Sequence, residues 1–196
     1  MITNLRHLLI QRAARLQDRP ALSAPEWGTL NYFQLRNRVE GVALGLMPLP
    51  LPEAGLFSAT QTPWDWICEL AVACCGLQWS PAGLLIEPSV LGGLRFNDEN
   101  GRQPYHDREE VIGEATLFLG NLSQGEWLRR LKRLNVKLGW DHTTLVEMPT
   151  EAFGTEEGRG ALWSGLFAGA HVQWISSNAR LEKAWDGAIF RDLFLE

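Results

Sequence analysis

The sequence predicts an α/β fold in which helices flank a mainly parallel sheet. Short apolar runs with strand character alternate with longer amphipathic stretches of helical spacing; the strand-like runs cover 21–23, 56–60, 114–120, 143–148 and 170–176. Strands that alternate with helices are typical of a parallel sheet whose faces the connecting helices cover. We find no internal repeat, low-complexity segment or linker, so we expect residues 1–196 to form a single domain.

The first elements follow from leucine spacing and turn residues. Leucines recur at helical spacing over 4–16, and Asn4 stands in position to cap that helix. A short strand at Ala21–Ser23 follows, then a turn over Pro25–Gly28. The next helix runs from about Tyr32 to Leu46, where a proline-rich stretch ends it.

The third helix carries the strongest signals. After a buried strand at 56–60, Thr62 can cap the helix, Pro63 takes its first position, and Asp65 favours the positive end of its dipole. Gly76 can end it in a left-handed conformation. Its inner stripe consists of Trp66, Ile67, Leu70 and Cys74.

The rest of the chain continues the alternation. Short extended pieces at 77–83 and 84–88 precede a hairpin-turn signal at Asn100-Gly101. A buried strand over 114–120 leads to a helix from about Gln124 to Leu138. The remaining elements are a strand at 143–148, a small-residue helix at 158–169, a strand at 170–176 and a helical stretch at 180–196.

Composition limits the classes of function. The chain is 45% hydrophobic and 21% charged, which is typical of a globular protein, and its net charge of -5 argues against nucleic-acid binding. We find neither a secretion signal nor a run of the ~20 apolar residues that a membrane span needs. The clustered Cys68, Cys74 and Cys75 indicate buried or free thiols in a reducing cytoplasm, and their spacing matches no metal motif.

The stretch GNLSQGEW at 120–127 resembles a phosphate-binding loop that has lost its key side chains. Gly120 and Gly125 keep the spacing of G-x-x-x-x-G-K-[S/T], but Glu126 and Trp127 replace the Lys and the hydroxyl residue. Ser123 and Glu126 form S-x-x-E, a capping box that satisfies backbone N–H groups from within. We interpret the stretch as a helix start; a weakened anion site is the alternative.

The helix that follows has two different faces. Trp127, Leu131, Leu134 and Leu138 share one narrow apolar arc. The outward arc carries Arg129, Arg130, Arg133 and Lys137. This pattern indicates a solvated basic face, and the alternative is a docking surface for an acidic partner or a carrier-protein phosphopantetheine.

We interpret the remaining clusters of titratable residues as structural and not as catalytic or metal-binding. Asp141 and His142 are adjacent and would face opposite sides of a strand, so Asp141 would not orient His142 for catalysis. Glu151, Glu156 and Glu157 could hold a divalent ion, but we interpret Thr155 as a helix cap and the glutamates as complements to the helix dipole.

The nine tryptophans include several near the ends of predicted elements, where partly exposed indoles favour an interface. These are Trp27, Trp64, Trp140 and Trp185. We therefore expect self-association into a homo-oligomer, or a protein partner.

The order of these pieces resembles the N-terminal subdomain of the adenylate-forming (AMP-binding) superfamily, which includes acyl-CoA synthetases and carrier-protein-loading adenylation domains. LLIQRAARLQDRPALS is similar to that family's first helix and strand. GTLNYFQLRNRVEGVALGL is similar to its early T-Y-x-E-L motif through Asn31, Tyr32 and Leu35, with Gln34 in place of the acid. TPWDWICELAVACCGLQWSPAG resembles the helix and strand that follow, and LWSGLFAGAHVQWIS resembles a later helix and strand.

The resemblance also assigns candidate site residues. The family's phosphate loop aligns with 119–127, where Gly120, Ser123 and Gly125 have counterparts and the Thr pair, Pro and Lys do not. VEMPTEAFG resembles the segment lining the acyl pocket, which implies a ligand pocket at Glu151, Phe153 and Gly154, with Glu151 where His is usual.

These departures shape the functional expectation. Adenylation needs a positively charged group beside the reacting phosphate, and the sequence shows neither the loop Lys nor the family's later signatures. We expect no catalytic residue, no metal site, and ATP or AMP with Mg²⁺ only if the loop functions. The favoured hypothesis is a non-catalytic binding or assembly module in the cytoplasm. The alternatives are one half of a split AMP-forming ligase and a small-molecule binding protein for acyl or aryl acids.

Overall fold

The computed structural model divides the chain into two compact units. One unit comprises Met1–Leu8 and Arg36–Leu128, the other Leu9–Leu35 and Arg129–Glu196, and each is described by itself. The described residues are 2–25, 27–46, 55–58, 60, 62–80, 83–86, 112–175 and 186–194. They confirm the predicted α/β class with a mainly parallel sheet and flanking helices. None of the described helices is both long and apolar enough to cross a membrane.

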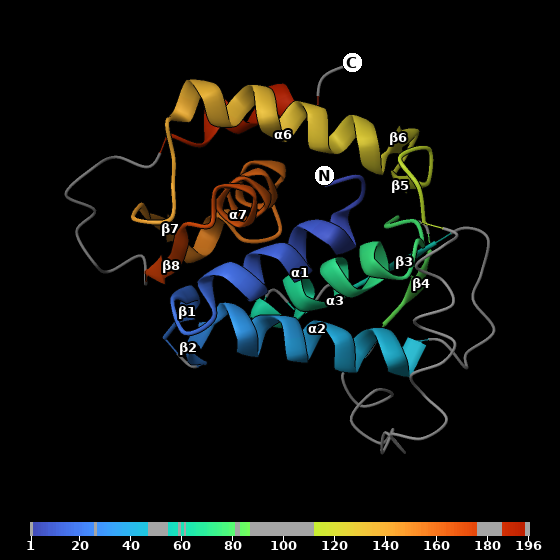
Figure 1. Ribbon diagram of the computed structural model, residues 1–196, viewed down its shortest axis with the longest axis horizontal. Helices are drawn as coiled ribbons and strands as arrows, with labels where there is room; N and C mark the ends of the chain where they lie inside the picture. Colours follow the sequence, from blue (N-terminus) through green and yellow to red (C-terminus); the bar gives the residue numbers. More distant parts are fainter. Residues whose placement is uncertain are drawn as a thin grey trace. The chain divides into compact units, whose positions relative to one another are not determined.

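The first unit is built around helix α3 and two pairs of short strands (Figure 1). Strands β3 and β4 pair in parallel, whereas β5 and β6 form an antiparallel hairpin. A parallel bridge joins Trp79 to Leu119 of β5. The elements that lie wholly or partly in this unit are α1 (Leu5–Leu16), α2 (Tyr32–Leu46), β3 (Leu56–Phe57), α3 (Pro63–Cys74), β4 (Leu84–Leu85), β5 (Leu117–Leu119), β6 (Leu122–Ser123) and α6 (Gln124–Leu138).

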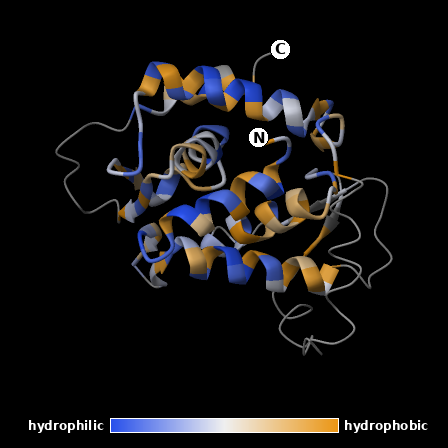
Figure 2. Ribbon diagram, in the orientation of Figure 1, coloured by the Kyte–Doolittle hydropathy of each residue, from blue (hydrophilic) through white to orange (hydrophobic). Residues whose placement is uncertain are grey.

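Helix α3 forms as the sequence predicts and is the centre of this unit. The Thr62 hydroxyl accepts from the Trp64 N–H at 3.3 Å, and Pro63 begins the helix. Buried Asp65 accepts from the Ser58 hydroxyl at 2.6 Å through Oδ1, which ties the preceding loop to the helix start. Nearly every residue of α3 is buried, in agreement with its apolar colouring in Figure 2.

The second unit contains the four-stranded sheet, with strand order β2-β1-β8-β7. The strands are β1 (Pro20–Ala24), β2 (Gly28–Asn31), β7 (Leu145–Pro149) and β8 (His171–Ile175). Strands β1, β8 and β7 run parallel, and β2 is the antiparallel edge. Helix α7 (Glu156–Ala168) packs against β7 and β8, and the 3-10 helix η2 (Gly187–Leu193) lies along α7.

The structure corrects four sequence predictions. Strand β2 begins at Gly28, the last residue of the predicted turn, and continues through residues 29–31, for which no element was predicted, because Gly28 at φ 68° lets the chain reverse within a few residues. The strand predicted over 114–120 shortens to β5 and is not buried, since Leu117 is 48% exposed and Phe118 alone points inward. Among the described residues of the strand predicted over 56–60, only Leu56–Phe57 form strand β3. Of the helical stretch predicted over 180–196, the structure describes residues 186–194, in which Gly187–Leu193 form the short 3-10 helix η2 instead of an α-helix. Asn100-Gly101 and Trp185 lie outside the described residues.

Candidate functional site

GNLSQGEW folds as a hairpin turn, a two-residue strand and the first turn of α6. Gly120 and Asn121 connect β5 to β6, which pair through Leu119 and Leu122. Gly120 adopts φ 56°, a left-handed conformation that glycine tolerates without strain, and it is exposed. The chain therefore reverses on itself here instead of passing from a strand into a wide loop.

The first three backbone donors of α6 all have acceptors within the chain. The Gln124 N–H donates to the Thr116 carbonyl at 2.8 Å, and the Gly125 N–H donates to the Glu114 carbonyl at 2.9 Å. The Glu126 N–H donates to the Ser123 hydroxyl at 3.2 Å. Phosphate sites at helix starts depend on such N–H groups being open. Because these three N–H groups already have acceptors, the residues of this turn do not fit a triphosphate.

The Ser123 bond is one half of the capping box that the sequence predicts. The other half, from the Glu126 side chain to the Ser123 N–H, stays a prediction. The two carbonyls that accept from Gln124 and Gly125 had no sequence signal, because they come from residues 114–116 outside the motif. Tertiary contact, in addition to local capping, thus closes the helix start.

Gly125 has a packing role that replaces the one it would have in a phosphate loop. A Cβ atom at this position would lie 2.8 Å from Glu114 Cβ and 2.9 Å from the Glu114 carbonyl oxygen. Real Cβ atoms do not approach a backbone so closely. The glycine therefore allows residue 114 to reach the helix start and accept its N–H.

The Gln124 side chain joins three helix ends and was missed by the sequence analysis. It is fully buried; its Oε1 accepts from the Leu5 N–H at 2.9 Å, and its Nε2 donates to the Ala73 carbonyl at 2.8 Å. Asn4 beside it donates to the Ile112 carbonyl at 3.0 Å and accepts from the His7 N–H, as its predicted cap role requires. An isolated glutamine carries no pattern that would reveal such a bridge.

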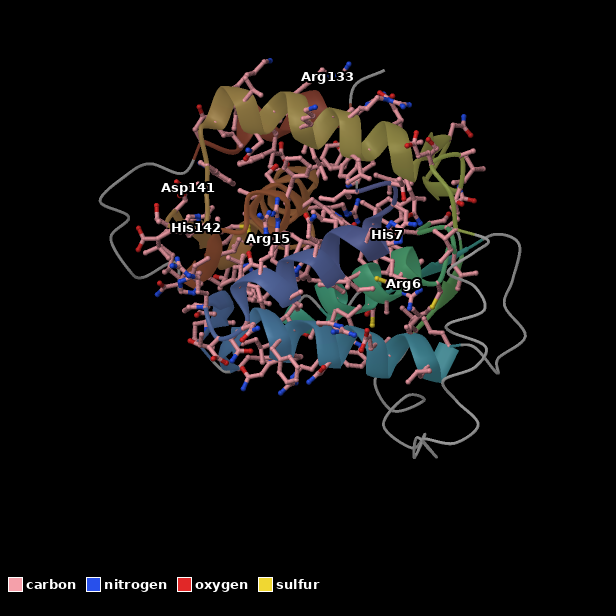
Figure 3. The ribbon with its side chains drawn as sticks, in the orientation of Figure 1. Arg6, His7, Arg15, Arg133, Asp141 and His142 are labelled. Carbon is pink, nitrogen blue, oxygen red and sulfur yellow. The ribbon has the colours of Figure 1, made fainter. Side chains whose placement is uncertain are left out.

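The remainder of α6 has the two faces that its sequence predicts. Trp127, Leu131 and Leu134 are buried, whereas Arg129, Arg133 and Lys137 are exposed. Figure 3 shows Arg133 on the outer side of the helix, and Figure 2 shows polar and apolar colours alternating along it. Arg130 departs from the pattern: it is half-buried and donates to the Leu193 carbonyl at 2.9 Å.

The second candidate site, Glu151, Phe153 and Gly154, lies around the 3-10 turn η1 (Thr150–Ala152) after β7. Phe153 packs on Trp174 of β8 with ring centroids 4.3 Å apart. Glu151 and Gly154 are exposed, and Gly154 adopts φ 80° with open space around it. This site belongs to the second unit, whereas the α6 start belongs to the first.

Asp141 holds a tight turn. Its Oδ1 accepts from the Thr143 N–H at 2.8 Å and from the Thr143 hydroxyl at 2.6 Å, and these bonds lower the pKa of the exposed carboxyl. The His142 carbonyl accepts from Arg19 Nη1 at 3.3 Å. This geometry agrees with the predicted loop role of both residues, which Figure 3 labels.

The predicted cap of α7 is also present. The Gly158 N–H donates to the Thr155 hydroxyl at 3.0 Å. Glu157 pairs with Arg191 at 2.6 Å, and the hydrogen bond lowers the pKa of this carboxyl. Within the described part of the chain, no group of three or more His, Cys, Asp or Glu residues could hold a metal ion.

Comparison with known proteins shows the fold. No family model matches the chain, and no curated protein matches its sequence. Solved structures do match: the N-terminal subdomain of Klebsiella oxytoca NpsA has a TM-score of 0.62 at 16% identity, over 89% of this chain and 54% of that chain. The N-terminal domain of FACL13 from Mycobacterium tuberculosis, solved with an inhibitor, has a TM-score of 0.62 at 12% identity, over 89% of this chain and 57% of that chain.

A third structure adds a carrier domain. The artificially fused adenylation–PCP di-domain NpsA-ThdA from Klebsiella oxytoca has a TM-score of 0.64 at 13% identity, over 89% of this chain and 40% of that chain. The chain thus has the fold of N-terminal subdomains of adenylation and acyl-CoA ligase enzymes, as its sequence resemblance implies. It spans about half the length of these solved structures.

Proposed function

We propose that the chain is a non-catalytic domain with the adenylating-enzyme fold, acting as a binding or assembly module in acyl, aryl acid or carrier-protein metabolism. One observation carries the proposal: the N–H groups of Gln124, Gly125 and Glu126 donate to acceptors within the chain. These are the groups that a phosphate at the aligned turn would need.

Electrostatics support the same conclusion. Glu126 places a negative charge in the stretch that aligns with the phosphate loop of the adenylate-forming superfamily. Two unit charges of the same sign ~4 Å apart repel by roughly 4 kcal/mol at an effective dielectric constant of 20. A helix dipole offsets at most about 2 kcal/mol of this repulsion. Transfer of a nucleotidyl group also needs positively charged groups that stabilise the negative charge of the transition state, and the turn supplies none.

Calorimetric titration with ATP·Mg²⁺, combined with a pyrophosphate-release assay over a panel of acyl and aryl acids, tests the proposal. We expect no heat of binding in the micromolar range and no pyrophosphate. Micromolar ATP affinity together with acid-dependent pyrophosphate release would overturn it.

A second candidate is one half of a split AMP-forming ligase, active with a second polypeptide. What supports it is the fold that the chain shares with N-terminal subdomains of adenylation and acyl-CoA ligase enzymes. The NpsA-ThdA fusion makes a carrier protein a reasonable partner class. To test this candidate, the pyrophosphate-release assay is repeated with added candidate chains that carry the family's later signatures. Pyrophosphate release by the mixture, but by neither chain alone, would favour the split ligase.

The third candidate is a binding protein for an acyl or aryl acid at Glu151, Phe153 and Gly154. Its support is that the exposed Glu151 lies two residues before Phe153, which packs on Trp174. A hydroxylated or cationic acid would meet the Glu151 carboxylate. Ligand-detected NMR with such acids, repeated on Glu151→Gln, tests this candidate, which would be rejected if both forms bind none.

A further inference from the structure

A row of polar side chains crosses three strands of the four-stranded sheet. Val146, Met148, Val172 and Trp174 are buried on one face. The other face is more open and carries Thr29 on β2, Ser23 on β1, and His171 and Gln173 on β8, of which the last three are half-buried. Alternation along each strand places these side chains together on the same face.

Ser23 lies within proton-transfer distance of a histidine. Its Oγ is 2.7 Å from His171 Nε2 and 2.8 Å from Thr29 Oγ1. When His171 carries its proton on Nδ1, Nε2 accepts from Ser23 and Ser23 accepts from Thr29. A hydroxyl and an imidazole at this separation match the geometry of an activated serine nucleophile.

The surroundings of the His171 imidazole favour its neutral form, which a general base needs. Partial burial lowers the pKa of His171 below its ordinary value. This shift favours the neutral form of the ring, which can accept a proton. Among the residues of the four strands, Glu147 is the other titratable group on this face, where it pairs in register with Gln173.

Gln173 supplies the third component. It is the register partner of Ser23 in the parallel pairing of β1 and β8, so its side chain emerges on the same face beside the hydroxyl. Side-chain amides can stabilise the oxyanion that forms when a nucleophile attacks a carbonyl group. The three groups stand on paired strands, which hold positions better than loops do.

We propose that Ser23, His171 and Gln173 form a nucleophilic site that accepts the acyl group of an activated ester or thioester. Ser23 Oγ attacks the carbonyl carbon while its proton passes to His171 Nε2, and the carbonyl electron pair moves onto the oxygen facing the Gln173 amide. Collapse of the tetrahedral intermediate breaks the bond to the alkoxide or thiolate, which takes the proton from His171. The products are acyl-Ser23 and a free alcohol or thiol.

The test uses p-nitrophenyl acetate with the full chain, followed by release of p-nitrophenolate, intact mass and peptide mapping. We expect about one acetyl group per chain, located on Ser23. Ser23→Ala should abolish this modification, and His171→Gln should slow it on the order of 100-fold, the contribution typical of a general base. Gln173→Leu should slow it at least ~10-fold, because it removes an oxyanion donor. The rate should fall as the pH drops through the lowered pKa of His171.

A matched control lies in the other unit. His7 Nδ1 is 2.8 Å from the Thr3 hydroxyl, a similar contact made by a threonine, so His7→Gln should leave acetylation of Ser23 unchanged. Circular dichroism of each variant verifies folding. Acetylation that is equal in folded Ser23→Ala, or is confined to lysines, would overturn the proposal and leave the row as a polar contact between strands. Because the site is independent of the α6 start, its failure would not affect the proposed function.

Discussion

At the scale of single residues, Gly125 and Gln124 show how a motif can keep its letters and change its role. Gly125 is a glycine because Glu114 occupies the space of a side chain, and Gln124 is buried because it bridges Leu5 and Ala73. The sequence predicted the cap by Ser123, since capping is local. It could not predict the contacts with residues 5, 73 and 114, because these depend on the tertiary fold.

Gly125→Ala should lower the free energy of unfolding by about 1–3 kcal/mol, the usual cost of forcing extra volume into a packed position. Gly113→Ala is the matched control, because a Cβ there would meet nothing within 4 Å, and it should change stability by less than about 0.5 kcal/mol. Urea denaturation of both variants measures the difference. Equal stability of the two variants would show that the approach of Glu114 is dispensable.

The cysteines provide a second prediction at this scale. Cys68, Cys74 and Cys75 are buried thiols, and burial, with a smaller contribution from Asp65, raises the pKa of Cys68 to about 12. The thiolate is the reactive form, so it stays scarce in the folded protein up to pH 9. A disulfide reagent such as DTNB should label Cys68 only after denaturation. Rapid labelling of Cys68 in the native state would contradict its burial.

At the scale of elements, prediction succeeded where a segment carries its own signals. Helix α6 begins and ends at the predicted residues because its apolar arc and cap are both local. Strands β5 and β6 were misjudged because the pairing that defines them is a hairpin around Gly120, and the apolar run 117–119 looked buried. The stretch 120–127 thus leads into a helix as predicted, but a hairpin, and not a single buried strand, precedes that helix.

Restoring the lost charge at this helix start should not restore phosphate binding. In Glu126→Lys the repulsion is gone, but the N–H groups of Gln124, Gly125 and Glu126 still have their acceptors. We expect ATP·Mg²⁺ to bind no tighter than about 1 mM, an affinity worth about 4 kcal/mol, in Glu126→Lys and in the neutral control Glu126→Gln. Calorimetry showing micromolar ATP·Mg²⁺ affinity for Glu126→Lys alone would contradict this expectation. It would mean that the negative charge of Glu126, and not the internal hydrogen bonds of the N–H groups, prevents binding.

At the scale of the whole molecule, the sequence predicted the fold class and the resemblance to adenylating enzymes, and the solved structures confirm the fold. Alternation of helices and strands along the chain was enough for this inference. How the chain associates depends on surfaces, which periodicity does not reveal. Self-association therefore stays a prediction.

Light scattering across a wide concentration range tests self-association. The exposed Phe33, Leu117, Val136 and Leu145 each leave apolar surface in contact with water. We expect the apparent mass to rise above the 22.0 kDa of one chain as concentration increases. A constant mass of one chain would reject self-association and favour a different protein partner.

Amide hydrogen exchange at the start of α6, followed by NMR with and without ATP·Mg²⁺, tests most directly whether the backbone N–H groups there are already hydrogen-bonded within the chain. The Gln124, Gly125 and Glu126 amides should be protected in the free protein, because each already has an acceptor, and ATP·Mg²⁺ should leave their exchange unchanged. Fast exchange of these three amides in the free protein, followed by protection when ATP·Mg²⁺ is added, would contradict the account.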